Sequence, residues 1–277
     1  MQKIIFSLLL MTFFIQTSLA QSSFIQNKVI AHRGAWKAKE LPQNSIASLR
    51  EAIRLGCEGS EFDVWMTADE VLVVNHDHEL QGMDIETSTY EQLLTKTLPN
   101  GEKIPTLKAY LTEGMAQKRT KLILEFKPSL ISVARSERVG ELSVKTVQEL
   151  GAQAWVDYIT FSYEGGVKAI ATDTKANVAY LNGDKSPQEL KEAGFFGFDY
   201  HISLLRRMPQ WIAEAKALGL TTNAWTVNKE EDMSWLLDQG VDFITTDEPE
   251  KLATLIPSKK SVNSQKKVSF SETFFCD

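Results

Sequence analysis

The sequence has 277 residues, of which 24% are charged and 43% are hydrophobic, and its 36 acidic and 30 basic side chains give a net charge of −6. The length suffices for one large domain with its own core, and the mild acidity without a basic patch argues against a nucleic-acid-binding protein. Two cysteines, Cys57 and Cys276, make a poor disulfide framework.

The N-terminus combines a short basic head, an apolar run over residues 4–15, and small residues at Ser18 and Ala20. This order is typical of a secretory signal peptide, because the apolar run is too short to span a bilayer. We therefore expect residues 1–20 to be cleaved near Ala20 and the mature protein to be periplasmic or secreted. A lipid anchor is not indicated, because the residue directly after the cleavage site is Gln21 and not cysteine, and no later apolar run is long enough to cross a membrane.

From residue 28 onward, apolar strand-like runs alternate with segments of helical periodicity. Helix signals include Gly56, which would end a helix over residues 45–53, and Ser186 with Glu189, which form a capping-box pattern. Strand followed by helix, repeated, favours a parallel sheet and predicts an α/β fold, a (β/α)₈ TIM barrel. The strand candidates lie at 29–33, 59–65, 71–76, 121–126, 158–162, 177–181, 196–200, 221–226 and 241–246.

These nine candidates are one more than a (β/α)₈ barrel needs. The run from Val71 follows the 59–65 strand too closely for a crossover helix, so we expect it to form a hairpin with that strand. It would lead into a small irregular insertion from His76 to about Pro105. We predict one barrel domain over residues 21–257, followed by a disordered tail of lysines and serines at 258–277.

Glu61 and Asp63 occupy the centre of the 59–65 strand. Residues two apart in a strand point to the same face, roughly 6.5 to 7 Å apart, so the two carboxylates project together. In a partly buried strand they would repel and would be costly to desolvate unless a metal, a proton or a basic side chain compensated them. The alternative interpretation is a pair of solvated carboxylates on an exposed strand face.

Other polar residues gather at the C-terminal ends of the predicted strands, where barrel chemistry takes place. Three carboxylates, those of Glu61, Asp63 and Glu125, would suit one Mg²⁺ or Ca²⁺ ion better than zinc. Arg33 and Lys127 would then bind a phosphate as a planar fork and a point charge. His32 and His76, also at strand ends, are candidates for an acid–base pair that would cleave a phosphodiester. Trp225 would form either an apolar wall of the substrate site or part of the core.

An ordered set of motifs runs from about residue 28 to 254. The motifs are His32-Arg33-Gly34, Pro42-Gln43-Asn44-Ser45, Glu61-Phe62-Asp63, Asn75-His76-Asp77, Glu125-Phe126-Lys127, Trp225-Thr226-Val227-Asn228 and Gly240-Val241-Asp242-Phe243-Ile244-Thr245-Thr246-Asp247-Glu248-Pro249. Together they resemble the glycerophosphodiester phosphodiesterase family. The resemblance implies a phosphatidylinositol-phospholipase-C-like TIM barrel with a divalent-metal site at the three carboxylates, the two histidines as acid–base pair, and Arg33 with Lys127 as phosphate binders. It also implies release of sn-glycerol 3-phosphate and an alcohol, with attack by the substrate's own glycerol hydroxyl through a cyclic phosphate as one route.

One position departs from the family pattern, because Gln43 stands where the family usually has glutamate. If this side chain only tethers its loop, activity survives, and if it tunes the metal or a histidine, rate or substrate choice differs. We favour the tether. His78 is interpreted as an insertion-loop side chain, and His201 fits a helix cap as well as a substrate contact.

The sequence therefore predicts an enzyme acting on a small-molecule glycerophosphodiester. One alternative keeps the barrel and the metal but cleaves lysophospholipid- or sphingomyelin-type substrates. Another is a catalytically silent glycerophosphodiester-binding protein, which would not require both histidines. The head group, the choice between Mg²⁺ and Ca²⁺, and the oligomeric state stay open.

Overall fold

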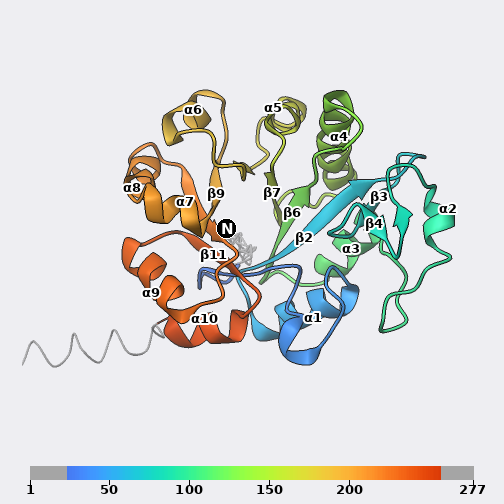
Figure 1. The fold of residues 1–277 in the computed structure, drawn as a ribbon, viewed down its shortest axis with the longest axis horizontal. Coiled ribbons are helices and arrows are strands. Elements are labelled where there is room, and N and C mark those ends of the chain that lie inside the picture. Colours follow the sequence, from blue (N-terminus) through green and yellow to red (C-terminus); the bar gives the residue numbers. More distant parts are fainter. Residues whose placement is uncertain (1–23, 257–277) are drawn as a thin grey trace, which may run out of the picture.

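The structure, a computed structural model, describes residues 24–256. Its centre is a nine-stranded sheet in the order β1-β11-β10-β9-β8-β7-β6-β2-β3, and an additional β1–β2 pairing closes the sheet on itself. Because β3 pairs with β2 in the antiparallel sense, the other eight strands form a closed parallel barrel. The predicted (β/α)₈ TIM barrel is confirmed. Figure 1 looks down this barrel, with the helices arranged in a ring around the strands.

Each barrel strand is followed by at least one helix on the outside, and in the case of β2 the strand β3 and an insertion come before it. The barrel strands are β1 (Val29–Ala31), β2 (Gly59–Met66), β6 (Lys121–Phe126), β7 (Val156–Thr160), β8 (Val178–Tyr180), β9 (Gly197–His201), β10 (Thr221–Trp225) and β11 (Phe243–Thr246). The surrounding helices are α1 (Ile46–Leu55), α3 (Leu107–Gly114), α4 (Val133–Glu149), α5 (Tyr163–Thr172), α6 (Pro187–Glu192), α7 (Ile202–Arg207), α8 (Gln210–Ala217), α9 (Glu230–Gln239) and α10 (Pro249–Leu255).

The helix ends follow the local sequence signals. Ser45 caps α1 by accepting a hydrogen bond from the Ser48 amide, and Gly56 ends that helix in the left-handed conformation. Ser186 and Glu189 form the predicted capping box of α6, with a proline in its first turn. These caps fix where each strand-to-helix connection enters its helix.

The predicted hairpin strand is confirmed as β3 (Leu72–Val74), which pairs antiparallel with β2. The insertion that follows is not irregular as expected, because it contains a short hairpin, β4 (Glu79–Leu80) with β5 (Met83–Asp84), and a helix, α2 (Tyr90–Leu93). Its apolar side chains pack into a small core together with Trp65 of β2 and Val73 of β3, which explains why the insertion is ordered. Figure 1 shows the insertion at one side of the barrel, beside β2. The core residues are Trp65, Val73, Leu80, Ile85, Leu93 and Ile104.

Several expected strands differ from the observed ones by one or two residues at an end, and a neighbouring helix explains two of these differences. The run predicted at 158–162 is strand β7 at Val156–Thr160, because Ser162 caps α5 instead of continuing the strand. The run predicted at 241–246 begins as a strand only at Phe243, because the Val241 amide still bonds to the carbonyl of Leu236 at the end of α9. In both cases the end of a helix forms hydrogen bonds at residues that would otherwise pair within the sheet.

The main core lies between the barrel strands and the surrounding helices, and a smaller apolar cluster fills the barrel itself. No helix of residues 24–256 is both long enough and apolar enough to span a membrane. The proposed signal peptide at 1–20 and the proposed tail at 258–277, with Cys276, lie outside the described residues.

Candidate active site

A pocket of about 200 Å³ opens at the C-terminal end of the barrel strands. It brings together all eight residues predicted from the sequence, from strands far apart in the chain. The predicted residues that line it are His32, Arg33, Glu61, Asp63, His76, Glu125, Lys127 and Trp225.

Glu61, Asp63 and Glu125 form a buried acidic cluster, in which one carboxylate oxygen from each residue lies within 4.8 Å of the other two. Asp63 on β2 stands directly opposite Glu125 on β6 in the parallel register, so both side chains point to the same face. Glu61 and Asp63, which are two residues apart in β2, thus form a three-carboxylate site together with Glu125 of the neighbouring strand β6.

Lys127 carries the main positive charge that the structure sets against this cluster. Its Nζ lies 2.7 Å from Asp63 Oδ1 and 2.7 Å from Glu125 Oε1. Burial lowers the pKa of Lys127, but the two carboxylates outweigh burial and hold that pKa above its usual value. A side chain predicted to meet phosphate therefore also bridges two of the three predicted metal ligands.

The acidic cluster is short of positive charge at Glu61. Burial, and then the charges of Asp63 and Glu125, raise the pKa of Glu61 well above its usual value. Burial also raises the pKa of Glu125, to about 7, despite Lys127. Glu61 Oε2 accepts a 2.7 Å hydrogen bond from the Arg33 amide, but its buried Oε1 has no hydrogen-bond partner.

These properties fit a divalent cation. An unpartnered buried oxygen is costly, and a hard cation bound by carboxylate oxygens would remove that cost and restore the charge balance. Glu61, Asp63 and Glu125 are the residues that would hold it.

The loop after β1 holds this cluster in place. Asn44 Nδ2 donates to Asp63 Oδ2 at 2.8 Å, and Asn44 Oδ1 accepts from the Asp63 amide at 3.0 Å. Burial raises the pKa of Asp63, but Lys127 and His76, with these hydrogen bonds, outweigh burial and leave the pKa below its usual value.

The turn after β1 requires glycine at position 34. Gly34 has a φ of 80°, and a Cβ atom there would approach Ser48 to 2.5 Å, so only glycine fits this turn.

His32 is oriented by a partner from the other end of the chain. Its Nδ1 lies 2.7 Å from Asp247 Oδ1, directly after β11, and Asn228 Nδ2 donates to Asp247 Oδ2 at 2.7 Å. Burial raises the pKa of Asp247, but the contact with His32 outweighs it, so the pKa stays below its usual value. With Nδ1 bonded to a carboxylate, the His32 Nε2 atom is the one left for substrate.

His76 follows β3 and reaches the pocket from the other side. Its Nδ1 lies 2.7 Å from Asp77 Oδ1, an exposed carboxylate. Burial lowers the pKa of His76, with Lys127 and Arg33 acting in the same direction and Asp63 opposing them. The neutral form of its imidazole is therefore favoured.

Arg33 contacts both the acidic cluster and the loop that carries Gln43. Its Nη1 donates to Gln43 Oε1 at 2.6 Å, and its Nε lies 3.8 Å from Asp63 Oδ2. Gln43 therefore contacts the guanidinium and not a carboxylate of the cluster, which is the tethering arrangement.

The opposite wall of the pocket is apolar. Trp225 packs edge-to-face against Phe161, with ring centroids 5.4 Å apart, and its Nε1 donates to the Asp199 carbonyl. His201 caps α7 and packs its ring against Trp225 at 5.0 Å. His78 lies in the insertion, 3.4 Å from Asp84, as an insertion-loop residue would.

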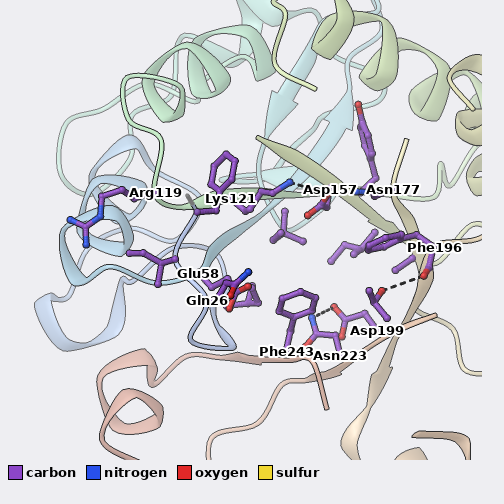
Figure 2. Close-up of a pocket in the computed structure, with 18 residues that line it drawn as sticks. Gln26, Glu58, Arg119, Lys121, Asp157, Asn177, Phe196, Asp199, Asn223 and Phe243 are labelled. Atoms are coloured by element: carbon purple, nitrogen blue, oxygen red, sulfur yellow. Dashed lines mark hydrogen bonds and ion pairs between the residues drawn. The ribbon is translucent and has the colours of Figure 1, made fainter. Parts of the chain in front are cut away.

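A larger cavity of about 870 Å³ lies at the opposite, N-terminal end of the barrel (Figure 2). The two histidines and the carboxylate cluster line the smaller pocket and not this cavity, so the smaller pocket is the candidate active site.

Asp199 lines both the pocket and the larger cavity, and Figure 2 shows its contact with Asn223. Burial raises the pKa of Asp199 well above its usual value, and its Oδ1 has no hydrogen-bond partner.

Sequence reasoning assigned no role to four residues that the structure places in or behind the site. Asn44, Asn228 and Asp247 lay inside quoted motifs, so the motifs themselves were a signal for them. Asp199 has only the weak signal of a charge within an apolar strand. Asn44 and Asp247 hold Asp63 and His32, Asn228 holds Asp247, and Asp199 lies beneath the pocket.

Comparison with known proteins points to one family. The profile described as the glycerophosphoryl diester phosphodiesterase family matches residues 32–251. A glycerophosphodiester phosphodiesterase of Caldanaerobacter subterraneus subsp. tengcongensis is 30% identical over 242 residues, covering 82% of this chain and 97% of that protein.

Solved structures agree with this assignment. A crystal structure of a glycerophosphodiester phosphodiesterase from Parabacteroides distasonis has a TM-score of 0.80 and 44% identity, covering 88% of this chain and 100% of that one. A phosphodiesterase from Oleispira antarctica, solved with the product sn-glycerol-3-phosphate, has a TM-score of 0.70 and 25% identity, covering 82% and 96%.

Proposed function

The chain belongs to the glycerophosphoryl diester phosphodiesterase family, and from this premise we propose that it hydrolyses glycerophosphodiesters to sn-glycerol 3-phosphate and an alcohol. The product bound to the Oleispira antarctica phosphodiesterase supports this choice of product. The observation that carries the proposal is the convergence of two histidines, two cationic side chains and three carboxylates on one pocket. Phosphodiester cleavage uses each of these groups.

His32 and His76 form the acid–base pair. One takes the proton of the attacking hydroxyl, which is that of water or of the substrate's own glycerol, and the other gives a proton to the leaving alcohol oxygen. If the glycerol hydroxyl attacks, the alcohol leaves from a cyclic phosphate, and a water molecule then opens this ring to glycerol 3-phosphate with the same pair moving the protons. Asp247 keeps the His32 ring in one orientation, and Asp77 does the same for His76. Both histidines then present Nε2 to the substrate.

Arg33 and Lys127 bind the phosphoryl oxygens. The planar guanidinium suits two oxygens at once, and the ammonium adds a point charge. A divalent cation, Mg²⁺ or Ca²⁺, held by Glu61, Asp63 and Glu125 would supply further positive charge where negative charge develops on the phosphate. Trp225 and Phe161 provide an apolar surface for the carbon atoms of the substrate.

We also propose that the enzyme is exported after cleavage of residues 1–20 and that residues 258–277 form a polar tail outside the barrel domain. Both proposals rest on the residue pattern alone. N-terminal sequencing of the protein from the periplasm or the medium tests the first, and an N-terminus at Met1 would contradict it.

The function is tested by release of glycerol 3-phosphate from a panel of glycerophosphodiesters by the mature protein, with Mg²⁺, with Ca²⁺ and with chelator. We expect turnover that requires the metal and that falls at least about 100-fold in His76→Ala. His78→Ala is the matched control, because this histidine also faces an aspartate but lies outside the pocket. Absence of turnover on every member with either ion would contradict the proposal.

A further inference from the structure

The loop that follows Lys127 exposes a row of aliphatic side chains. Leu130, Ile131 and Val133 are 67%, 58% and 58% exposed, and Ser132 and Ala134 beside them are exposed as well. There is no charged residue between Lys127 and Arg135. We call residues 130–133 the apolar loop, although Val133 is also the first residue of α4. Its three aliphatic side chains adjoin one another and are three of the five large hydrophobic side chains exposed in the described part of the chain. Such a concentration is a candidate interaction surface.

The apolar loop is held rigidly by the insertion. Buried Glu86 accepts hydrogen bonds from Ser129 Oγ at 2.6 Å and from the Leu130 amide at 2.8 Å. Arg135 closes the arrangement, because its Nε lies 3.0 Å from Glu86 Oε1 and its Nη2 donates to the carbonyls of Met66 and Thr67. The hydrogen bond from the Leu130 amide to Glu86 and the one from the Ile131 amide to Ser129 Oγ fix the start of the loop, whose aliphatic side chains are exposed.

The apolar loop also lies beside the active site. Lys127, which lines the pocket, precedes it by three residues, and the loop occupies the C-terminal end of the barrel, where the pocket opens. A surface that covers the loop therefore lies on the side of the barrel where the pocket opens.

The size of the patch favours a lipid surface over a second protein. The three side chains offer roughly 200 Å² of apolar area, whereas a stable protein interface takes about 800 Å² from each partner. A bilayer is fluid and needs no complementary shape, and the strength of reversible binding to it scales with the apolar area that is buried.

We propose that the apolar loop inserts into the surface of a phospholipid bilayer and thereby presents the active-site pocket to phosphodiesters at that surface. This inference rests on the proposed function for the reaction in the pocket. The contact with the bilayer depends only on Leu130, Ile131 and Val133. The loop thus adds a membrane-docking role to a barrel whose described helices do not cross a membrane.

Co-sedimentation of the mature protein with phosphatidylcholine vesicles tests the proposal. Zwitterionic vesicles are chosen because they do not attract the protein by net charge. We expect wild-type protein to bind, and Leu130→Ser combined with Ile131→Ser to lower the partition coefficient about tenfold. Val167→Ser is the matched control, because this valine is 40% exposed on α5, and it should bind as wild type does.

Turnover of soluble glycerophosphocholine is measured in the same preparations. Equal turnover in all of them would show that the double substitution leaves the fold and the pocket intact. No vesicle binding by wild type, equal binding by the double variant, or a dimer that only the double variant disrupts would each overturn the docking role. Loss of glycerophosphocholine turnover in every preparation would contradict the proposed function while leaving the vesicle result to decide the docking role.

Discussion

His32 Nδ1 lies 2.7 Å from Asp247 Oδ1 although 215 residues separate the two along the chain. The contact exists because β1 and β11 are neighbours in the closed barrel, so that the residues just after both strands meet at one end. Asn228 fixes the second carboxylate oxygen of Asp247. The aspartate is thereby held in one position and orients the histidine ring.

Replacing Asp247 by asparagine should lower kcat about 100-fold with little change in KM, because the ring of His32 would lose the carboxylate that fixes its orientation and tautomer. Steady-state kinetics on glycerophosphocholine measures the effect. Asp84→Asn is the control, since Asp84 contacts His78 outside the pocket. A kcat within threefold of wild type in Asp247→Asn would remove the aspartate from the mechanism.

Glu61→Gln should abolish most of the stabilisation by Mg²⁺ or Ca²⁺. An ion at 100 times its dissociation constant stabilises a protein by about 2.7 kcal/mol, which is roughly 5 to 10 °C in Tm for a domain of this size. Differential scanning calorimetry with and without metal measures the shift. Glu58→Gln is the matched control, because burial also raises the pKa of Glu58, which caps backbone amides away from the site.

The same variant has a pH signature in chelator. The raised pKa of Glu61 means that ionising it costs the folded protein stability, and this cost grows as pH rises above the unfolded value of about 4.5. Metal-free Glu61→Gln should therefore be more stable than wild type at pH 7, and the difference should disappear as pH falls toward 4.5. Urea unfolding at several pH values tests this, and a variant less stable than metal-free wild type at pH 7 would contradict it.

Glu51 should contribute stability at neutral pH that is lost in acid. Arg54, and also Lys39, lower its pKa from 4.5 to about 2 against the effect of burial, so its contribution is complete above 4.5 and declines as pH falls toward 2. Because both basic partners are more than half exposed, Glu51→Gln should cost about 1 kcal/mol at pH 7 and less than half of that at pH 3. Urea unfolding, with exposed Glu149→Gln as control, measures both values.

Gln43→Glu should keep activity within about threefold, because glutamate still offers an oxygen to Arg33. Gln43→Leu removes that oxygen and frees the guanidinium, so KM should rise about tenfold, the size of one hydrogen bond to a charged group. Parallel kinetics on the two variants separates a tether from a direct role in the chemistry. A large loss of kcat in Gln43→Glu would show that the side chain tunes the site.

Much of the fold could be predicted from local patterns. The alternation of strand and helix signals, and the short spacing between the runs at 59–65 and 71–76, predicted a (β/α)₈ barrel with one antiparallel strand added to β2. Strand ends were less certain, as β7 shows, because a capping serine and an apolar run compete for the same residues. The regular structure of the insertion was not predicted, because the small core that stabilises it brings together side chains spread along the chain from Trp65 to Ile104.

The sequence by itself determined which chemical groups the site contains. Glu61 and Asp63 share a face because strands have a period of two, and strand ends of a parallel barrel must meet at one rim. Only the tertiary structure decided the partners: Lys127 between Asp63 and Glu125, Asp247 on His32, Gln43 on Arg33, and Glu86 beneath the apolar loop. Local periodicity fixes the direction of a side chain, whereas contacts across the barrel depend on strand order and register, which arise only when the sheet closes.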